Sequence, residues 1–207
     1  MFDFRTPQHN AMRFIYVLPY SPHRALVEYT LFSPTLLPQA EYEAALRSYV
    51  ADVLGLTDYR IVDEEQDLIP MTEHPCARRA GRRVMNIGTR GGRVKASTGY
   101  AFHRIQQDSA AIVASLRRHG HPFDVPPQPR RYRLFDAILL EVLGARGDLG
   151  APLFTALFQN NPIQRIFRFL DEEDGLGGNL QLLASLPPVP FIAAWLRLAR
   201  RRLRLDL

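Results

Sequence analysis

The stretch IGTRGGRVKASTGYAF (residues 87–102) combines four glycines with three cations and leads directly into a helical pattern. The apolar segment RVMNIG (83–88) predicts a short strand, so the sequence predicts a strand, a glycine-rich turn and a helix in succession. Such a turn presents backbone N–H groups and the positive end of a helix dipole to an anion. The glycine spacing matches neither the Walker loop nor the Rossmann fingerprint. Two interpretations stay open: a tight turn that needs positive φ, or a loop that holds a phosphate.

Basic residues gather around this loop. All of the 26 basic residues except Lys95 are arginines, and the formal net charge is +5. Acids outnumber bases from Met1 to Glu73, whereas the stretch from His74 to Gln107 contains no acid. This distribution predicts a local field that attracts an anion. The alternative source of the arginine excess is the base composition of the genome.

The bulk composition limits the classes of function. The 207 residues suffice for a substantial core, and their composition is that of a globular protein. The single cysteine, Cys76, excludes a disulfide framework and predicts a reducing, cytoplasmic setting. There is no signal-peptide pattern, and no apolar run approaches the ~20 residues of a spanning helix. His119 and His121 lack companion ligands, so no metal site is expected.

The first part of the chain predicts a sheet with helices. Alternating residues at 13–20 and 24–32 predict an antiparallel hairpin, and the pattern at 39–55 predicts a helix ended by Gly55. Residues 59–71 predict a further strand and a turn. Ser97 or Thr98 is the expected N-cap of the helix that follows the glycine loop and stops at Gly120. The residues expected on the buried face of that helix are Phe102, Ile105, Ser109, Ile112 and Leu116.

A proline-rich connector at 121–129 is the best internal boundary. It divides the chain into residues 1–120, with the sheet and the glycine loop, and residues 121–207, which read as helical. The expected class is α/β or α+β, with a mixed or antiparallel sheet part followed by a helical part.

Glu28 is the one strand carboxylate with a candidate chemical role. It shares its strand face with Leu26, Thr30 and Phe32. If that face is interior, removal from water makes the carboxyl a usable proton donor near neutral pH. The open alternative is an edge strand with Glu28 in water or paired with Arg24.

The C-terminal helix is amphipathic. Arg197, Arg200, Arg201 and Arg204 form one stripe, and the opposite side carries Ile192, Trp195, Leu196, Ala199 and Leu203, interrupted by Arg202. A basic face, an apolar face and a tryptophan predict a helix in a membrane interface. The alternative is a terminal helix docked on the core with a solvated arginine face. Nucleic-acid binding is not expected, because the aromatic and basic interleaving of single-strand binders is missing.

Several stretches together resemble the bacterial lycopene cyclases, flavin-dependent enzymes of carotenoid synthesis. They are FDFRT, FIYVLPYSPHRALVEYTLFS, IPMT, IGTRGGRVKASTGYAFHRIQ and the later FLDEED with LASLPPVPF, in collinear order over nearly the whole chain. The resemblance implies an FAD-binding flavoprotein fold and an intramolecular lyase or isomerase. Such an enzyme converts the linear ψ-ends of lycopene to β-rings with no net redox change, while its FAD is kept reduced, as by NAD(P)H.

The resemblance also assigns residues. The family's catalytic acid falls on Glu28, and a second acid found next to it in many members is replaced here by Tyr29. The implied FAD contacts are Gly88, Thr89, Gly91, Gly92, Thr98, Gly99 and Tyr100. The implied substrate is lycopene or another linear carotenoid, reached from the cytoplasmic face of the membrane through the C-terminal helix.

The family's opening G-x-G-x-x-G motif is missing from this sequence, and MFDFRT matches a phrase that lies mid-chain in the family. We therefore expect the carboxyl-terminal half of a cyclase, which binds FAD poorly alone and has weak or no activity without a separate FAD-binding chain. Two alternatives stay open. One is a fragment of a related FAD-dependent prenyl reductase or monooxygenase, and the other is an inactive remnant that binds membrane surfaces.

Overall fold

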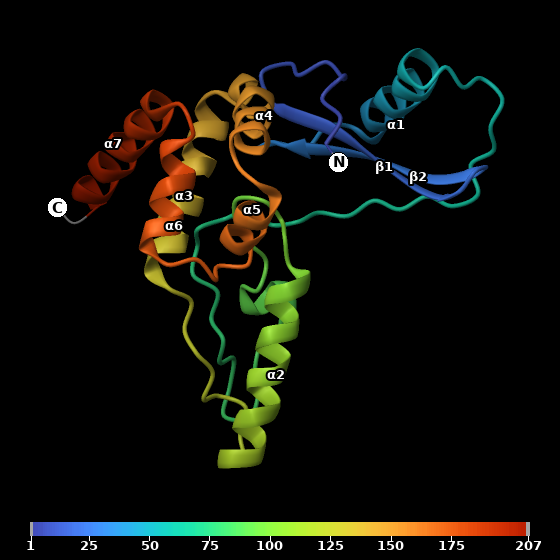
Figure 1. Cartoon of the computed structure of the whole chain (residues 1–207). Coiled ribbons are helices and arrows are strands. Elements are labelled where there is room, and N and C mark those ends of the chain that lie inside the picture. The colour runs from blue at the N-terminus through green and yellow to red at the C-terminus, as the bar shows by residue number, and fades with distance from the viewer. Residues whose placement is uncertain (1, 206–207) are drawn as a thin grey trace. The chain divides into compact units, whose positions relative to one another are not determined.

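The computed structural model describes residues 2–205, except for the side chains of residues 202, 204 and 205 (Figure 1). It is an α+β protein, as the sequence predicts, with one two-stranded antiparallel sheet and a predominantly helical remainder. The chain forms two compact units. The first comprises Met1–Asp67 with Val142–Ala156, and the second comprises Leu68–Glu141 with Leu157–Leu207. The expected boundary at residues 121–129 lies inside the second unit.

The first unit is built on the hairpin of β1 (Met12–Ser21) and β2 (Arg24–Phe32). Its register pairs Phe14 with Thr30 and Tyr16 with Glu28, so these four side chains share one face of the ribbon. Phe2, Phe4, Phe14, Tyr16, Phe32 and Phe154 form an aromatic cluster on this side of the unit. Burial concentrates at the start of β1, while the turn end of both strands is exposed.

The N-terminal segment is pinned to the hairpin through Asp3. Its backbone N–H donates to the carbonyl of Ile15 at 2.9 Å, and the Ile15 N–H donates back to the Asp3 carbonyl at 2.9 Å. The Asp3 carboxylate accepts from the Arg5 guanidinium and from the Tyr49 hydroxyl at 2.6 Å. The hydrogen bonds from Arg5 hold the pKa of Asp3 well below its usual range. Burial raises the pKa of the Tyr49 hydroxyl, and its bond to Asp3 adds to this.

The predicted helix at 39–55 is confirmed. It consists of α1 (Gln39–Ser48) and a π-helical turn (Tyr49–Val53), and Gly55 follows with φ +67°. The predicted strand at 59–71 is wrong, because these residues are extended and exposed without secondary structure. A strand needs a ladder partner for its N–H and carbonyl groups. In the described part of the chain, only the hairpin forms a ladder longer than an isolated bridge.

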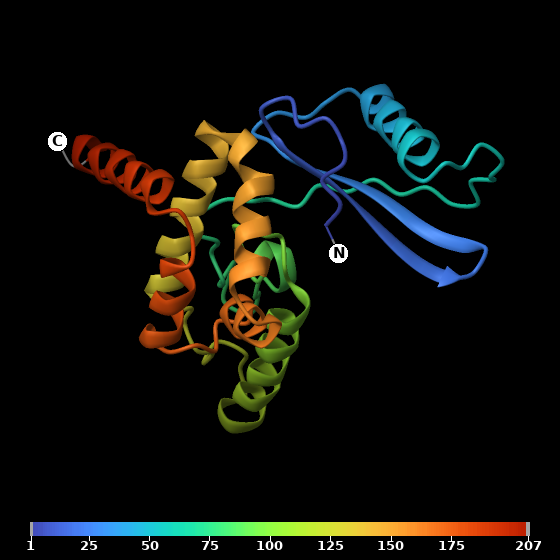
Figure 2. The same ribbon diagram turned by 45° about the horizontal axis from the view of Figure 1, so that its top comes forward.

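The second unit is helical. After a short 3₁₀ turn (Gly88–Gly91) come α2 (Phe102–His119), α3 (Arg130–Ala145), α5 (Ile163–Leu170), α6 (Leu176–Ala184) and α7 (Pro188–Leu205). A second 3₁₀ turn (Gly147–Leu149) and the start of α4 (Gly150–Asn160) belong to the first unit, as does the last turn of α3. Within the second unit, α3 and α6 lie side by side (Figures 1 and 2).

Two expectations about this unit are wrong. The strand predicted at 83–88 is reduced to an isolated bridge between Arg79 and Met85, with Val84 exposed. The second error concerns α2, whose buried residues are Arg104, Asp108 and Ser115, whereas Phe102 and Leu116 of the expected apolar face are exposed. The polar side of α2 faces inward because its residues have partners there: Asp108 pairs with Arg78 and Arg93, Arg104 lies 3.8 Å from Glu172, and Ser115 donates to the His121 carbonyl. The predicted stop at Gly120 is confirmed by its φ of +69°.

Candidate functional site

The glycine loop folds back on itself. Residues Gly88–Gly91 form the 3₁₀ turn, and Gly88 and Gly92 adopt φ values of +56° and +70°, a left-handed region that favours glycine. The Arg93 N–H donates to the Gly88 carbonyl at 3.0 Å and closes the turn. The positive-φ interpretation of this stretch is therefore confirmed at these two positions.

Gly91 is required by packing within the chain. A Cβ atom at this position would lie 2.5 Å from Arg78 Nη1 and 2.5 Å from the Asn86 carbonyl oxygen. Arg78 donates to that carbonyl at 3.0 Å and to both carboxylate oxygens of Asp108 at 2.8 and 2.9 Å. Arg78 thus connects the segment before the loop to the middle of α2, and Gly91 leaves room for its guanidinium.

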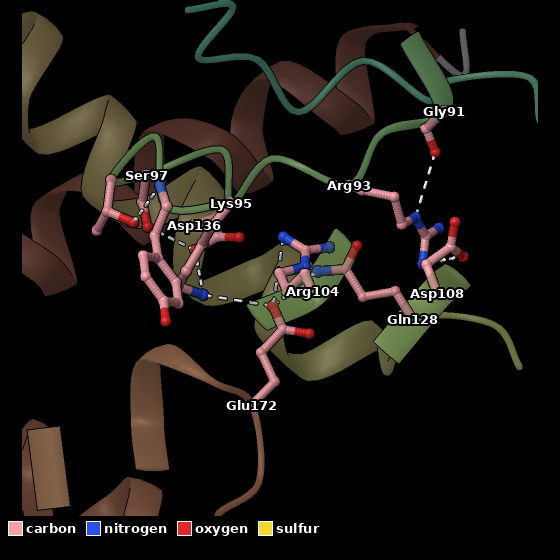
Figure 3. A network of polar contacts seen from close by, with 11 residues as sticks. Gly91, Arg93, Lys95, Ser97, Arg104, Asp108, Gln128, Asp136 and Glu172 are labelled. Atoms are coloured by element: carbon pink, nitrogen blue, oxygen red, sulfur yellow. Dashed lines mark hydrogen bonds and ion pairs between the residues drawn. The ribbon is translucent and has the colours of Figure 1, made fainter. Parts of the chain in front are cut away.

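Arg93 adds to the contacts that Arg78 makes with the loop and with Asp108. Its Nε donates to the Gly91 carbonyl at 3.3 Å, and its Nη1 lies 3.7 Å from Asp108 (Figure 3). Burial lowers the pKa of Arg93, and the charge of Asp108 opposes that shift. One carboxylate from α2 therefore serves two arginines of the loop region.

Lys95 is fully buried and is the centre of a second network (Figure 3). Its Nζ lies 2.8 Å from Asp136 Oδ1 of α3 and 3.4 Å from Glu172 Oε1. The rings of Tyr132 and Phe169 lie 5.4 and 5.5 Å from the same ammonium, within the range of a cation–π interaction. A buried ammonium is tolerated only when it is paired in this way.

Glu172 enters this network from a strained backbone. Its φ is +63°, which is uncommon for a residue with a side chain and costs about 1–3 kcal/mol. Its carboxylate accepts from Gln128 Nε2 at 2.9 Å and lies 3.8 Å from Arg104 Nη1 of α2. The surroundings hold the strain, because this conformation brings the carboxylate to hydrogen bonds from Lys95 and Gln128 and to the positive charge of Arg104.

Glu172 belongs to the acidic loop, Asp171–Asp174, which joins α5 to α6. Glu173 lies 3.2 Å from His103 Nε2, and Asp174 lies 3.3 Å from Arg168 Nε. The Asp174 carbonyl accepts from the Tyr132 hydroxyl at 2.8 Å. The acidic loop therefore meets the first turns of α2 and α3.

These contacts neutralise part of the expected field of cations. Arg78 and Arg93 pair with Asp108, and Lys95 pairs with Asp136 and Glu172, which are acids from outside the stretch 74–107. Other arginines of the stretch lie exposed on the surface, namely Arg79, Arg82, Arg83 and Arg90. The sequence locates the cations correctly and misses their partners, because those partners lie up to 77 residues away.

The start of α2 differs from the prediction. Its N-cap is Ala101, without a side-chain hydrogen bond, whereas Ser97 is buried and donates to Asp136 Oδ1 at 2.6 Å. Thr98 Oγ1 accepts from the Tyr100 N–H at 3.3 Å, so neither expected residue caps the helix. Burial, and then the charge of Asp171, raises the pKa of Tyr100. No side chain caps the first turn of α2, so its backbone N–H groups are not used by a cap. Backbone N–H groups of this kind are the donors that bind an anion at a helix N-terminus.

The implied FAD contacts fall into two groups. Gly88 has open space where a Cβ would lie, and Thr89 and Tyr100 are exposed, so these residues can reach a ligand. Gly91 is buried, and a Cβ at Gly92 or Gly99 would touch the side chain of Cys76 or Ile69. Gly88, Thr89 and Tyr100 are therefore the members of this set that a ligand can reach most readily. Their roles in FAD binding stay predictions.

Glu28 lies in the first unit, and its carboxylate is exposed. The Thr30 hydroxyl donates to its Oε1 at 2.9 Å, and the described residues give it no ion pair with Arg24. Across the ribbon, burial raises the pKa of Tyr16 to about 12, and the charge of Glu28 contributes to the rise. Tyr29 turns to the other face and accepts from Arg13 Nη1 at 3.1 Å. The structure therefore places Glu28 in water beside aromatic rings.

The sequence did not indicate Asp136 and Glu172, and it did not indicate that Lys95 is buried against them. Two signals could have indicated them: Lys95 is the only lysine among 26 basic residues, and Glu172 lies in the run DEED just after an apolar helix. Neither feature of the sequence indicates that Lys95 and Glu172 contact each other. Among the described residues, no group of three His, Cys, Asp or Glu side chains could hold a metal ion.

Comparison with known proteins gives one match. Neither the curated proteins nor the solved structures include a match to this chain. The family model described as lycopene cyclase protein matches residues 1–196, which is most of the chain. This match supports a lycopene cyclase-like enzyme of carotenoid biosynthesis that acts on a carotenoid substrate. The chain belongs to the lycopene cyclase family.

Proposed function

We propose that this chain carries the acid that cyclises the linear ψ-ends of lycopene to β-rings. The observation behind this proposal is the hairpin face that places Glu28 beside aromatic rings. Glu28 pairs across the ribbon with Tyr16, whose ring centroid lies 5.1 Å from that of Phe14 and 5.3 Å from that of Phe2. A carboxylic acid next to aromatic faces suits a reaction that begins with protonation and passes through a cation.

In this reaction the substrate first gains one proton and the cyclic intermediate later loses one. The Glu28 carboxyl donates a proton to the terminal double bond of the ψ-end, and the electron pair of that bond forms the new C–H bond. The neighbouring double bond attacks the resulting carbocation and closes the ring. The ring then loses a proton to water, and the electron pair of the broken C–H bond restores a double bond. Atoms and electrons balance, because the product is an isomer of the substrate.

The aromatic rings would stabilise the intermediate charge. The negative face of an aromatic ring attracts a cation within about 6 Å of its centroid, an interaction worth about 2 kcal/mol once water is removed. Tyr16 is well placed for this role, because it lies directly opposite Glu28 in the register. Its phenol stays neutral well beyond physiological pH, since burial raises its pKa to about 12.

The substrate itself would prepare Glu28 for proton donation. Glu28 is exposed on the hairpin, where water favours the carboxylate. A carotenoid end lying on this face would exclude water, and removal from water favours the protonated carboxyl. Because Tyr29 stands where many members have a second acid, we assign proton donation to Glu28 alone.

FAD is the cofactor that we propose for this reaction. Reduced FAD, when bound, would supply negative charge that stabilises a carbocation. Gly88, Thr89, Thr98 and Tyr100 would contact it, with the uncapped start of α2 directed at a phosphate. Gly91, Gly92 and Gly99 would shape the backbone behind these contacts. A separate FAD-binding chain would complete the site.

A substitution at Glu28 tests the assignment. We expect Glu28→Gln to reduce conversion of lycopene to cyclic carotenoids by at least about 10²-fold, measured in lycopene-containing membranes with FAD, a reductant and the separate FAD-binding chain. Glu41→Gln, which changes another exposed acid in the same unit, should leave conversion unchanged. Unchanged conversion in Glu28→Gln would overturn the role of this residue.

Product masses under anaerobic conditions separate the other chemistries. Cyclisation leaves the mass of the carotenoid unchanged, a prenyl reductase adds hydrogen, and a monooxygenase adds oxygen when air is admitted. We expect an isomer of lycopene under anaerobic, reducing conditions. Reduced or oxygenated products in its place would contradict the proposed function.

A further inference from the structure

Helix α2 turns an apolar face away from the unit to which it belongs. Its buried side is polar, whereas the face that the sequence predicts to be buried is open. Phe102 is 71 % exposed, Val113 and Leu116 are also exposed, and Ile105 and Ile112 are half-buried. In both views the last turns of α2 extend beyond the other helices of the second unit (Figures 1 and 2). An amphipathic helix normally packs such a face against another element.

The spacing of this face is that of a seam between two helices. We call the following residues the α2 stripe: Phe102, Ile105, Ser109, Ile112 and Leu116. They follow one another at intervals of three and four residues, which is the pattern of the a and d positions of a coiled coil. At 100° per residue they span about 80° of the helix surface. A narrow stripe with this period fits a second helix.

Buried contacts fix the rotation of α2 about its axis. Asp108 accepts from Arg78 at 2.8 and 2.9 Å, and Ser115 donates to the His121 carbonyl at 2.6 Å. The centre of this buried side lies about 100° around the helix from the centre of the α2 stripe. Turning the stripe inward would break the buried ion pair of Asp108, which is costly. The α2 stripe therefore stays on the surface of its unit.

Opposite charges lie at the two ends of the stripe. The last turn of α2 carries Arg117 and Arg118, which are both exposed. At the first turn lies the exposed Glu173 of the acidic loop, 3.2 Å from His103 Nε2 and 3.4 Å from Gln107 Nε2. The helical period places Arg117 and His103 on the same flank of the stripe. This flank is therefore acidic at the start of α2 and basic at its end.

A second copy of α2 that runs antiparallel matches the stripe. With a two-fold axis at the middle of the helix, Ile105 faces Leu116 of the second copy, and Ser109 faces Ile112 of the second copy. The small Ser109 leaves room for the larger isoleucine, so the two helices can approach closely. One stripe thus supplies both sides of a closed, symmetric contact.

The same arrangement pairs the charges. In the antiparallel register Arg117 lies at the level of His103 of the second copy, where the exposed Glu173 of that copy is held. Parallel helices would instead place Arg117 beside Arg117 and Glu173 beside Glu173, and like charges in contact are costly. Charge therefore favours the antiparallel pair and a second copy of this chain as the occupant.

We propose that α2 forms a symmetric, antiparallel dimer with α2 of a second copy of this chain. The α2 stripe makes the apolar contact, and Arg117 of each copy lies beside Glu173 of the other. This inference does not rest on the proposed cyclase function, because neither Glu28 nor the proposed FAD contacts supply a residue to the contact. Another protein is the competing occupant, and the test below gives it a different result.

The oligomeric state of the full chain tests the proposal. A contact between one pair of helices is smaller than a standard protein interface, so the dimer should be weak and reversible. We expect a monomer of 23.6 kDa at about 1 μM and mostly dimer at about 100 μM, measured by sedimentation velocity. A monomer over this whole range would overturn the proposal and leave the α2 stripe to a different protein.

Helix α7 supplies a control surface, because it also has exposed apolar side chains. Val189, Ile192 and Trp195 are exposed, and the side chains of Arg202 and Arg204 lie outside the described residues. No single helix in the described part of the chain could cross a membrane, and α6 with α7 meets the length and composition of a span only as a pair bent by 117°. Residues 188–205 include five arginines and no acid, so pairing two copies of α7 would bring like charges together.

Paired substitutions locate the interface. Phe102→Ser with Leu116→Ser should weaken dimerisation at least about tenfold, because it removes two exposed apolar side chains of the α2 stripe from each copy. Val189→Ser with Ile192→Ser removes a matched exposed pair on α7 and should leave the dissociation constant unchanged. Circular dichroism checks that each variant is folded. Equal weakening in the α7 control would contradict the assignment to α2.

Exchange of charges tests the antiparallel arrangement. Arg117→Glu and Glu173→Arg should each weaken the dimer at least about threefold, because each places like charges together across the contact. The combined variant restores opposite charges and should recover most of the affinity. High salt should reduce the differences among these variants. A combined variant that dimerises no better than the single variants would overturn the antiparallel pairing.

Discussion

Lys95 and Glu28 are both charged groups beside aromatic rings, and they lie in opposite environments. Lys95 is fully buried, with two carboxylates within 3.4 Å of its ammonium and the rings of Tyr132 and Phe169 around it. Glu28 is exposed and accepts a single described side-chain hydrogen bond, from Thr30. The buried group has all the partners that it needs for stability. The exposed group has free capacity for chemistry with a ligand.

The difference separates a structural role from a functional one. A buried ion pair is costly to break because the partner left behind keeps its desolvation penalty. An exposed carboxylate loses little when it is neutralised, because water solvates it in either state. Substitutions at Lys95 should therefore affect folding, and substitutions at Glu28 should affect turnover with little effect on folding.

The largest effect is expected at Lys95. Lys95→Met leaves Asp136 and Glu172 buried without their cation and should lower the free energy of unfolding by about 3–5 kcal/mol, measured by urea denaturation. Arg90→Met, at an exposed cation of the same loop, should change it by less than about 0.5 kcal/mol. Similar values for the two variants would remove the contrast between buried and exposed charge.

The glycines of the loop offer a second, smaller test. Gly91→Ala forces Arg78 and the Asn86 carbonyl apart, because a Cβ would lie 2.5 Å from each, and should cost about 2–3 kcal/mol. Gly88→Ala meets no atom within 4 Å, so it should cost only the strain of its positive φ, about 1 kcal/mol. Thermal unfolding of both variants measures the order, and a larger loss at Gly88 would contradict it.

Some elements of the fold could be predicted from the sequence, and others could not. The hairpin, the helix at 39–55 and the end of α2 at Gly120 follow from local alternation, spacing and glycine position, and they were predicted. The strand predicted at 59–71 is absent, because a strand exists only where a partner accepts its hydrogen bonds. Likewise the inward side of α2 is decided by Asp108 and its bond to Arg78, 30 residues away. Pairings of this kind leave no trace in local periodicity.

The sequence left pairing and burial open at the cation-rich loop and at Glu28. The loop was expected to form a field that attracts an anion, and the structure pairs Arg78, Arg93 and Lys95 with acids while four other arginines stay exposed. For Glu28 an interior face and an exposed edge strand were both open, and the structure shows an exposed carboxylate. Composition along the chain records where charges lie, whereas burial and pairing depend on segments that meet only in three dimensions.

The partly buried carboxylate of Asp3 should make the stability of the folded state depend on pH in the acid range. Asp3 is 22 % exposed at its side chain, and its bonds to Arg5 lower its pKa, so the pair stabilises the folded state above the usual value of 3.8. This contribution is lost as the pH falls below 3.8 towards the lower pKa of the folded state. Asp3→Asn should cost about 1 kcal/mol at neutral pH and reduce the acid dependence of unfolding. An unchanged acid dependence would show that other carboxylates dominate it.

The smallest effect should appear at Tyr16, and it links stability to the Glu28 face. Burial and the charge of Glu28 raise the pKa of Tyr16 from 10.0 to about 12, so the folded state favours the neutral phenol. Its contribution to stability is complete below pH 10.0 and is lost as the pH rises through about 12. Because burial is the larger cause, Glu28→Gln should lower the pKa of Tyr16 only slightly, and ultraviolet absorbance of the tyrosinate measures the change. Tyr29, which lies on the other face and pairs with Arg13, should titrate unchanged in this variant and provides the internal control.

A large fall in the pKa of Tyr16 would mean that Glu28→Gln had opened the aromatic cluster to water. Any loss of cyclisation in that variant would then report on packing, and no longer on the missing acid.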